Sequence, residues 1–507
     1  MSNAKILTLD ELEAKSRELR AAGRRVVMCH GTFDLMHTGH IKHLQRAKVE
    51  GDVLLVTLTG DAYVNKGPGR PVFGEDLRAE ALASLACVDY VAINYEQAAI
   101  KAIRRLKPNV YVKGSEYRAA MDDVTGNILR EKDAVEEGGG TIFYTDEITF
   151  SSSSLLNEHF GVFSPETKDY LQVFRKQHGP KEVIELVKGL AGLKVLIVGD
   201  AIIDQYHYIK TLGQVGKGLA LAVKYESEEQ FAGGSIAVAN HLAGFVDEVT
   251  LVTGLGKIES HEQYIRSKLQ PNVRPEFFMI DDARTVTKRR FVDQELSKLF
   301  EVYFFNEEPV AEKVEKALCT WLEANLAKYD VVIVPDFGNG FISERMVQVL
   351  CAKARFLAVN TQLNSGNRGH HVINRYARAD FVSINEPELR LAAHNRHSPI
   401  EEIAEMVGER VKAKNIAITR GAQGVMFNDR TRRNTFNVPA LSTKVLDRIG
   451  AGDAFLALAG LCVGGGLSPE VSAFVGSVSA ALEVQIVGNR EPVDSVALFK
   501  YVTTLLK

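Results

Sequence analysis

The stretch VMCHGTFDLMHTGHIKHLQRAK, residues 27–48, decides the fold of the first part of the chain. An apolar run ends at Gly31, and a helical pattern begins beside two histidines three positions apart, His37 and His40. Residues three apart share one face of a helix, and the unpaired backbone N–H groups at a helix start favour phosphate. The stretch therefore predicts a strand, a turn and a helix, with two imidazoles facing a phosphate group.

The four histidines of this stretch also suggest a metal site, which would need a third or fourth protein ligand. Cys29, His30 and His43 are the candidates, but a strand-to-helix geometry would scatter them. Two imidazoles at a helix start can instead donate hydrogen bonds to a pentavalent phosphoryl centre and its leaving pyrophosphate. We therefore favour phosphoryl chemistry over metal binding.

The composition excludes several classes of protein. The 507 residues are too many for one core, so we expect two or three domains. A net charge of −3 provides no basic field for nucleic acid or for an anionic membrane. The five cysteines contain no CxxC pair, and the first residues lack the apolar region of a signal peptide. We expect a cytoplasmic protein with neither nucleic acid nor membrane as partner.

Apolar runs alternate with helical patterns in two parts of the chain, which predicts parallel sheets covered by helices. The first alternation ends near residue 160, and a polar segment with scattered Pro and Gly follows it. Two segments of the second alternation indicate antiparallel strands of a small lid. We predict an α/β protein with a Rossmann-like domain at residues 1–160, a partly helical linker at 161–192, and an α/β domain with a β lid at 193–507.

The motif GTFDLMHTGH, residues 31–40, resembles the nucleotidyltransferase signature of the cytidylyltransferase-like superfamily. NKGPGRPVF with Lys66 and Arg70, EDLRAEAL, VYVKGSEY and the serine-rich FSSSSLLN follow in the order of that family. The resemblance implies catalytic roles for His37, His40 and Lys66. It also implies nucleotide or phosphate contacts for Gly31, Thr32, Phe33, Arg78, Lys113, Ser151, Ser152 and Ser153.

A second candidate site lies in RIGAGDAFLALAG, residues 448–460. Small residues before a helix let backbone N–H groups approach an anion closely. Asp453 would then stand at the helix start, beside a phosphoryl group in transit, where a carboxylate can take the proton of an attacking hydroxyl. The pattern predicts a kinase site with Asp453 as the general base.

The second part of the chain, from about residue 193, resembles the ribokinase-like (PfkB-type) carbohydrate kinases. FAGGSIAVANHLAGFV, residues 231–246, is similar to their first signature, and LDRIGAGDAF, residues 446–455, to their second. The resemblance implies that Glu388 acts on Mg²⁺ indirectly and that Asp447 lies near a monovalent cation. It also implies phosphate or nucleotide contacts for Asn385, Glu388, Thr419, Gly421, Gly450, Ala451 and Gly452, and substrate contacts for Asp200, Asp204, Gly233, Gly234, Asn240 and Lys288.

The whole chain resembles the bifunctional enzymes of ADP-heptose synthesis, heptose 7-phosphate kinase joined to heptose 1-phosphate adenylyltransferase, with the two halves in reverse order. It departs from them near the sugar: the lid has no proline-rich stretch, and VNTQLNSGNRGHH, residues 359–371, replaces an Asp-Pro-Lys element. Thr285, Lys288 and Arg289 suit a second phosphate on the acceptor, or form an ordinary charged lid strand.

These resemblances imply a sugar-phosphate kinase and a nucleotidyltransferase that makes a nucleotide-activated sugar such as ADP-heptose. They imply sugar phosphates and nucleoside triphosphates as substrates, ATP or CTP as co-substrate, Mg²⁺ and K⁺ as cofactors, and a homodimer. The alternative is a CTP-dependent glycerol- or polyol-phosphate cytidylyltransferase fused to a carbohydrate kinase of other specificity or to a degenerate kinase-like module.

Overall fold

The computed structural model describes residues 4–114 except 65 and 68, residues 127–145, and residues 163–507 except 217, 307, 368 and 443. The chain forms two compact units. The first comprises Met1–Leu171 with Phe499–Lys507, and the second comprises Gln172–Leu498. Across these described ranges, no helix is both long enough and apolar enough to cross a bilayer.

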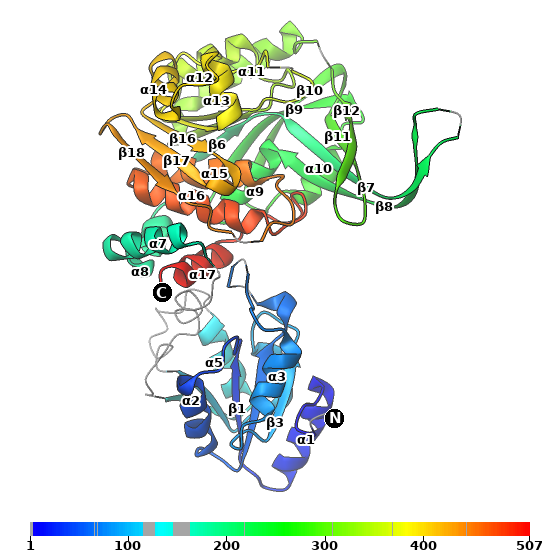
Figure 1. The fold of residues 1–507 in the computed structure, drawn as a ribbon, viewed down its shortest axis with the longest axis vertical. Helices are drawn as coiled ribbons and strands as arrows, with labels where there is room; N and C mark the ends of the chain where they lie inside the picture. The colour runs from blue at the N-terminus through cyan, green and yellow to red at the C-terminus, as the bar shows by residue number, and fades with distance from the viewer. Residues whose placement is uncertain are drawn as a thin grey trace. The chain divides into compact units, whose positions relative to one another are not determined.

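The first unit is a parallel sheet of five strands in the order β3-β2-β1-β4-β5 (Figure 1). Alternate residues of β1 face opposite sides of the sheet, as strand geometry requires. Val27 packs with α2 and α3, whereas Met28 packs with α1, α4 and α5. The elements are α1 (Leu9–Ala21), β1 (Val26–Gly31), α2 (Thr38–Lys48), β2 (Val53–Thr59), α3 (Glu75–Ala83), β3 (Tyr90–Asn94), α4 (Ile100–Leu106), β4 (Val110–Gly114), α5 (Asn127–Glu137) and β5 (Thr141–Thr145).

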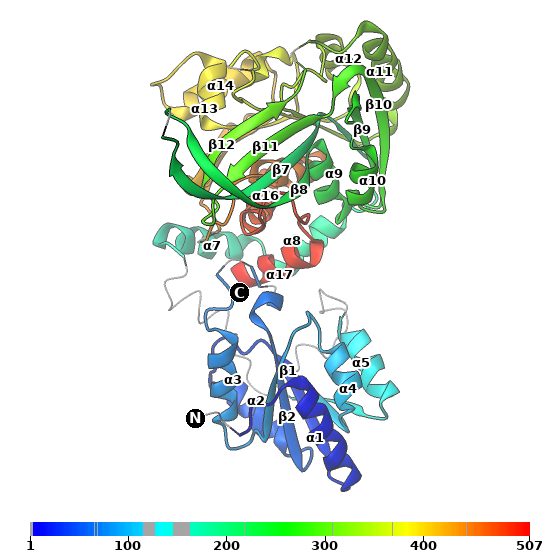
Figure 2. The same cartoon turned by 90° about the vertical axis from the view of Figure 1, so that its right-hand side faces the viewer.

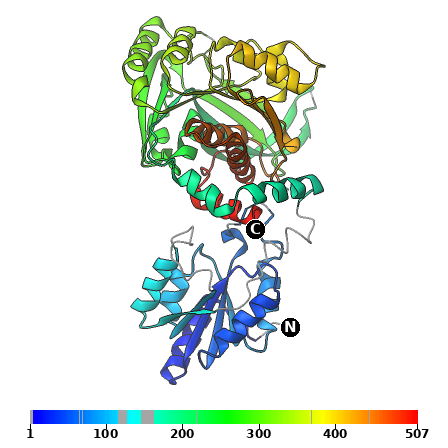
Figure 3. The ribbon, with the colours of Figure 1, turned by 90° about the vertical axis from the view of Figure 1, so that its left-hand side faces the viewer.

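The second unit has a nine-stranded sheet in the order β10-β9-β6-β13-β14-β15-β16-β17-β18. It is parallel except for β17 and β18, and it lies between α11–α14 on one face and α9, α15 and α16 on the other (Figures 1 and 3). The strands are β6 (Val195–Val198), β9 (Val249–Ile258), β10 (Val273–Arg284), β13 (Val331–Asp336), β14 (Leu357–Thr361), β15 (Phe381–Asn385), β16 (Asn415–Thr419), β17 (Val425–Asp429) and β18 (Asn434–Val438).

The helices of this unit include two in the region expected to be a linker, α7 and α8. The helix bounds are α7 (Pro165–Gln177), α8 (Pro180–Lys188), α9 (Ser235–Ala243), α10 (Glu262–Lys268), α11 (Glu312–Asn325), α12 (Glu344–Lys353), α13 (Glu386–Ala393), α14 (Ile400–Arg410), α15 (Ala451–Gly464), α16 (Pro469–Glu483) and α17 (Ser495–Leu505). Helices α7 and α17 each contribute residues to both units.

A four-stranded lid in the order β12-β11-β7-β8 accompanies the second unit (Figure 2). Its strands are β7 (Ala201–Gln214), β8 (Leu221–Gly234), β11 (Val286–Val292) and β12 (Lys298–Phe304). β7 and β8 form a long antiparallel hairpin, but β11 runs parallel to β7. The α/β class, the Rossmann-like first sheet and the β lid are therefore confirmed, and the exact domain boundaries stay predictions.

Candidate active sites

The two signature histidines of the first unit stack on each other at the start of α2. His37 is the N-cap residue, and its Nδ1 accepts a hydrogen bond of 3.1 Å from the backbone N–H of Gly39. The rings of His37 and His40 lie 4.0 Å apart between centroids. The Nε2 of His37 and the Nδ1 of His40 are buried and make no hydrogen bond within the described chain. Each histidine therefore retains a ring nitrogen that a ligand can use.

Burial disfavours the charged form of both imidazoles. It lowers the pKa of His37, and, with the neighbouring charges of His37, Lys66 and His43, it lowers the pKa of His40 to about 3. A neutral imidazole carries one N–H and can donate one hydrogen bond. The other two histidines are engaged elsewhere: His30 contacts the Thr57 hydroxyl at 2.9 Å, and His43 contacts the Thr145 hydroxyl at 2.8 Å.

The turn between β1 and α2 has a constrained backbone. Phe33 has a positive φ of 52°, and its ring lies edge-on to His40 with centroids 5.3 Å apart. A Cβ on Gly31 would fall 3.1 Å from the Phe33 ring, so a larger residue would crowd the turn. Thr32 lies between them and offers its carbonyl to Arg78.

Arg78, which the motif places among the phosphate ligands, instead joins several loops of the protein. Its buried guanidinium donates to the carbonyls of Thr32 at 2.5 Å, Thr59 at 2.9 Å and Phe73 at 2.9 Å. It also forms an ion pair of 2.5 Å with Asp61. The carbonyls of Thr32 and Thr59 belong to the segments that leave β1 and β2, so Arg78 fixes the edge of the sheet that carries the site.

Asp34 is a residue of this site that motif reasoning missed. Its buried carboxylate accepts from the backbone N–H of Val72 at 2.7 Å and of Phe73 at 3.1 Å, and it lies 3.5 Å from Arg70. The signature turn and the loop that carries Lys66 and Arg70 are thereby joined. The sequence contained a signal for this residue, since an Asp directly follows Gly-Thr-Phe in the signature motif.

The remaining predicted residues of this unit have different surroundings. Burial and the charges of Lys507 and Arg70 lower the pKa of Lys66 to about 8, against the opposing effect of Asp34. A Cβ on the next residue, Gly67, would fall 1.9 Å from the ring of Tyr501, so the segment Phe499–Lys507 covers this loop. Lys113, at the end of β4, pairs with Glu131 at 2.9 Å. Ser151, Ser152 and Ser153 lie outside the described residues.

In the second unit, α15 begins at the predicted anion hole. Gly450 is the N-cap residue with φ 86°, and a Cβ there would fall 2.6 Å from Asn489 Oδ1. Ala451 and Gly452 open the helix, so their N–H groups have no intrahelical partner. Asp453 follows in the first turn. Burial, and then the charge of Asp204, raise the pKa of Asp453 to about 7, close to the pKa of an effective base at neutral pH.

The predicted sugar ligands lie where β6 ends and the lid begins. Asp200 is buried and accepts from the N–H of Phe337 at 3.2 Å, while its Oδ1 makes no hydrogen bond among the described residues. Asp204 pairs with Arg290 of β11. A Cβ on Gly233 would fall 2.2 Å from Asp204 Oδ2, and Gly234 has φ 62°, so both glycines are sterically required.

Two polar residues expected at the substrate are used within the fold. Asn240 bonds the carbonyl of Lys268 at 2.9 Å and the N–H of Gln270 at 3.0 Å. Thr285 accepts from Gly256 and donates to Ser260. Lys288 is different, because it is buried and its charge acts on Asp453. Arg289 donates to Gln205 at 2.9 Å.

Asn385 and Glu388 form a capping box at the start of α13. Glu388 also accepts from the N–H of Leu363 at 2.9 Å, so both of its oxygens are held by backbone N–H groups. Thr419, at the end of β16, pairs with Asn385, and Gly421 follows it with φ 57°. The carboxylates of Asp204 and Glu388 both raise the pKa of Asp453. Among the described residues, no group of three or more His, Cys, Asp or Glu side chains could hold a metal ion, and the backbone bonds to Glu388 would favour contact with Mg²⁺ through water.

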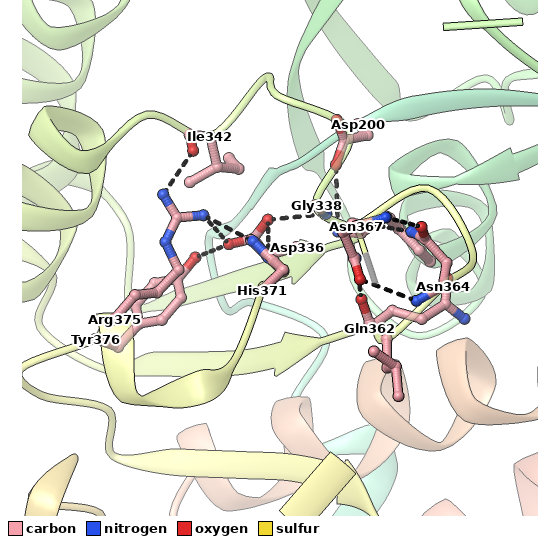
Figure 4. Close-up of polar contacts among 12 residues, drawn as sticks. Asp200, Asp336, Gly338, Ile342, Gln362, Asn364, Asn367, His371, Arg375 and Tyr376 are labelled. Carbon is pink, nitrogen blue, oxygen red and sulfur yellow. Dashed lines mark hydrogen bonds and ion pairs between the residues drawn. The ribbon is translucent and has the colours of Figure 1, made fainter. Parts of the chain in front are cut away.

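A buried network around Asp336, shown in Figure 4, was not predicted from the motifs. Asp336 ends β13 and lies 2.9 Å from His371 Nε2 and 2.9 Å from Arg375, and it accepts from the Tyr376 hydroxyl at 2.7 Å. Burial opposes its ionisation, but these partners hold the pKa of Asp336 below its ordinary value. Burial, and then the charge of Asp336, raise the pKa of Asp200 to about 6.

The asparagine-rich loop that replaces the Asp-Pro-Lys element folds onto itself beside this network (Figure 4). Asn364 donates to the carbonyl of Phe337 at 2.7 Å, and Asn367 donates to that of Gln362 at 2.8 Å. The departure from the family pattern is thus a differently built loop next to the predicted acceptor residue Asp200.

Asp447 does not fit the cation-ligand role expected for it. Its carboxylate accepts from the Tyr206 hydroxyl at 2.6 Å, from the N–H of Gly488 at 3.1 Å and from the N–H of Ile449 at 3.2 Å. The ammonium group of Lys298 lies 3.2 Å away and is a fourth donor. These donors occupy the oxygens that a monovalent cation would need.

The sequence profile of the pfkB family carbohydrate kinases matches residues 193–495, more than half of the chain. The chain belongs to the pfkB family. The cytidylyltransferase-like profile matches residues 28–158. The protein is therefore a carbohydrate kinase joined to a nucleotidyltransferase, with the transferase first, and these families act on sugars or sugar phosphates and nucleotides.

The transferase region has close relatives. It is 44% identical over 143 residues to the bifunctional protein HldE of Geobacter metallireducens, a match that covers 28% of each chain. It is 40% identical over 133 residues to HldE of Aliarcobacter butzleri, which covers 26% of this chain and 28% of that protein. The alignment thus spans less than a third of the length of these relatives.

The kinase region resembles solved kinases at low identity. Ribokinase of Arabidopsis thaliana, complexed with ribose and ATP, is 17% identical with a TM-score of 0.48, over 62% of this chain and 99% of that one. Phosphofructokinase-2 of Escherichia coli, in complex with potassium, is 16% identical with a TM-score of 0.49, over 61% of this chain and 99% of that one.

Proposed function

We propose that the protein makes a nucleotide-activated sugar in two steps. The kinase half transfers the γ-phosphoryl group of ATP to a sugar phosphate of the heptose 7-phosphate type. The transferase half joins a nucleoside triphosphate to the sugar 1-phosphate and releases pyrophosphate, giving a product such as ADP-heptose. The observation that carries the proposal is the neutral histidine pair at the start of α2, within a region 44% identical to HldE.

In the transferase half, His37 and His40 would donate hydrogen bonds to the phosphoryl centre and the leaving pyrophosphate. This role needs no proton transfer, because a neutral imidazole stabilises the charge that develops in the transition state by a hydrogen bond alone. Lys66 would add a positive charge. Lys113 and Ser151–Ser153 would bind the phosphates, and Gly31–Phe33 would contact the nucleotide. Arg78 acts as a positioning residue through its bonds to Thr32 and Thr59.

In the kinase half, Asp453 would take the proton of the attacking hydroxyl while the N–H groups of residues 450–452 bind the transferred phosphoryl group. Asp200 and Asp204 hold sugar hydroxyls, with Lys288 beside them, and Asn385 and Glu388 order the water shell of Mg²⁺. The metal, when bound with ATP, would neutralise the charge of the phosphates. Thr419 and Gly421 lie on the nucleotide side.

The alternative function is a CTP-dependent glycerol- or polyol-phosphate cytidylyltransferase fused to a kinase of another specificity. The rebuilt loop at Gln362, Asn364 and Asn367 favours a changed acceptor, since it lies beside Phe337, whose N–H binds Asp200. This alternative keeps both mechanisms and changes only the substrates.

We also propose a cytoplasmic homodimer that pairs through the lid. The five cysteines are free thiols, which suits a reducing compartment. The lid exposes Leu212, Leu221, Tyr225 and Phe300, apolar side chains that a second copy would cover. Sedimentation of the protein before and after Leu221→Glu would test the dimer.

One reaction mixture tests the pathway. It contains the protein, Mg²⁺, ATP, CTP, a heptose 7-phosphate and a bisphosphate-specific phosphatase, because the kinase product carries two phosphates. Mass spectrometry should find ADP-heptose. Heptose bisphosphate, or the heptose 1-phosphate that the phosphatase makes from it, should not form with Asp453→Asn and should still form with His40→Ala. CDP-heptose would change the nucleotide, and the absence of any heptose product would reject the sugar.

A further inference from the structure

The backbone that leads into the proposed anion hole is held by the carboxylate of Asp447, which is contacted by four donor groups. Asp447 precedes Gly450 by three residues, and its bonds to the N–H groups of Ile449 and Gly488 join the loop before α15 to the loop after α16. The N–H of Leu446 also donates to Val484 at 2.8 Å. The backbone that leads into the anion hole is therefore fixed by Asp447.

An ionised carboxylate at this position needs compensation. It is almost fully buried, and negative charge develops close by when a phosphoryl group enters the anion hole. A buried charge is stable only when it is paired and hydrogen-bonded. The ion pair with Lys298 at 3.2 Å supplies a positive charge from within the protein, and the Tyr206 hydroxyl supplies a further bond.

Both of these donors come from the lid. Lys298 is the first residue of β12 and pairs with Val292 of β11, and Tyr206 belongs to β7. The turn before Lys298 is fixed, because Asp293 accepts from the N–H groups of Glu295 and Ser297. The Lys298 ammonium also lies 6.0 Å from the centre of the Tyr206 ring. The lid thus carries a positive charge to the base of the anion hole.

We propose that the ammonium group of Lys298 is a built-in cation of the kinase half, so that this half needs no monovalent metal ion. Lys298 is a positioning residue: it neutralises Asp447, and Asp447 holds the loop that forms the anion hole. Because Lys298 belongs to the lid, the anion hole reaches its working state only when β12 is docked. The proposal rests on the kinase assignment and not on the identity of the sugar.

A second buried carboxyl lies near Gly450, but it is not a substitute cation ligand at neutral pH. Glu483 is fully buried, and a Cβ on Gly450 would fall 2.7 Å from its Oε1. Burial, with the charges of Asp453 and Asp447, raises the pKa of Glu483 to about 9, so this carboxyl is protonated and uncharged. Asp447 is therefore the group that needs a positive partner.

The test compares K⁺ with tetramethylammonium, an ion too large for a protein cation site, in two assays. Calorimetry measures the affinity for the Mg²⁺ complex of a non-hydrolysable ATP analogue, and a coupled assay measures ADP formation with the sugar phosphate. The binding assay needs no acceptor, so it tests the cation proposal even if the sugar is wrong. A wrong sugar would abolish only ADP formation in the coupled assay.

We expect the wild-type values in the two salts to agree within about twofold. Lys298→Met should lose about tenfold in tetramethylammonium and regain part of the loss in K⁺ or ammonium, and Lys298→Arg should retain the wild-type behaviour. The matched control is Lys224→Met, which removes an exposed lysine of lid strand β8. A wild-type protein that K⁺ activates by more than about fivefold would overturn the proposal, and so would a Lys298→Met variant with unchanged values in both salts.

Discussion

The starts of α2 and α15 are both proposed phosphate sites, but the first carries histidines and the second carries an aspartate. Each helix begins at a proposed phosphate site, where unpaired N–H groups favour an anion. At α2 the helix is capped by the side chain of His37, whereas at α15 Gly450 reaches a left-handed conformation and uses no side chain. Burial lowers the pKa of His40 to about 3 and raises that of Asp453 to about 7.

This difference separates two kinds of phosphoryl chemistry. Burial disfavours the charged form of either group, so it favours neutral histidines and makes Asp453 able to exchange a proton near neutral pH. In nucleotidyl transfer to a sugar phosphate the attacking phosphate oxygen has no proton to remove, whereas in phosphoryl transfer to a hydroxyl the attacking group has one. In the proposed mechanisms both helix starts attract phosphate, and the side chain at each start decides whether a proton is removed.

The largest effect should follow from Asp453→Asn, which removes the base and keeps its size. We expect the kinase rate to fall about 10³-fold, within the usual range for a general base, while nucleotidyl transfer changes little. ADP formation and pyrophosphate release, measured on the same preparation, check both halves. Glu470→Gln, in the first turn of α16, is the matched control. An equal loss in both reactions would contradict separate sites.

Arg78→Gln should chiefly affect stability. The guanidinium makes three bonds to carbonyls and one ion pair in a buried position, so its loss leaves several groups without partners. We expect the first unit to lose about 3 kcal/mol in free energy of unfolding, as for removal of one partner of a buried pair. Urea denaturation monitored by hydrogen exchange in β1 and β2 would measure it. A stable variant with weaker nucleotide binding would instead return Arg78 to the phosphate ligands.

His40→Ala should lower nucleotidyl transfer about 10²-fold, as the loss of one donor to a transition state usually does. The matched control is His43→Gln on the same helix, because His43 bonds Thr145 and has no proposed part in catalysis. Pyrophosphate release gives both rates. If the two variants lose activity equally, the effect comes from packing of α2 and the hydrogen-bond role is wrong.

The pH profiles of the two halves should run in opposite directions. Asp453 acts when deprotonated, so the kinase rate should rise about tenfold per pH unit below about 7 and level off above it. His40, whose pKa burial lowers to about 3, is neutral throughout this range. Lys66 acts when protonated, so nucleotidyl transfer should be flat up to about pH 7 and decline above its pKa of about 8. Parallel profiles for the two reactions would contradict the assignment.

Much of this arrangement could be predicted from local patterns. Apolar runs that alternate with helical patterns predicted the strands, and short motifs such as GTFD and GAGD predicted the two helix starts. Prediction failed where a partner lies far away in the chain. The pair of Lys298 and Asp447 and the pair of Asp204 and Arg290 depend on how the lid closes over the sheet, which no local pattern records.

The network at Asp336 was not predicted, for a different reason. Asp336 lies at the carboxyl end of a parallel strand, as Asp200 and Asn385 do, so the rule for α/β sheets could have found it. Its partners His371 and Arg375 follow a loop that lacks the expected family element, and the motif comparison stopped there. Arg78 is a third case, since the motif suggested a phosphate ligand and the structure shows a guanidinium bonded to three carbonyls and to Asp61.

The composition of the first unit has a consequence for synthesis. The loop with Lys66 is among the first parts of the chain to leave the ribosome, but Tyr501 and Lys507, which cover it, are more than 400 positions further along. At ordinary elongation rates, the delay is on the order of half a minute. A nascent transferase half therefore lacks Tyr501 over this loop and the charge of Lys507 near Lys66 until the entire kinase half has been translated.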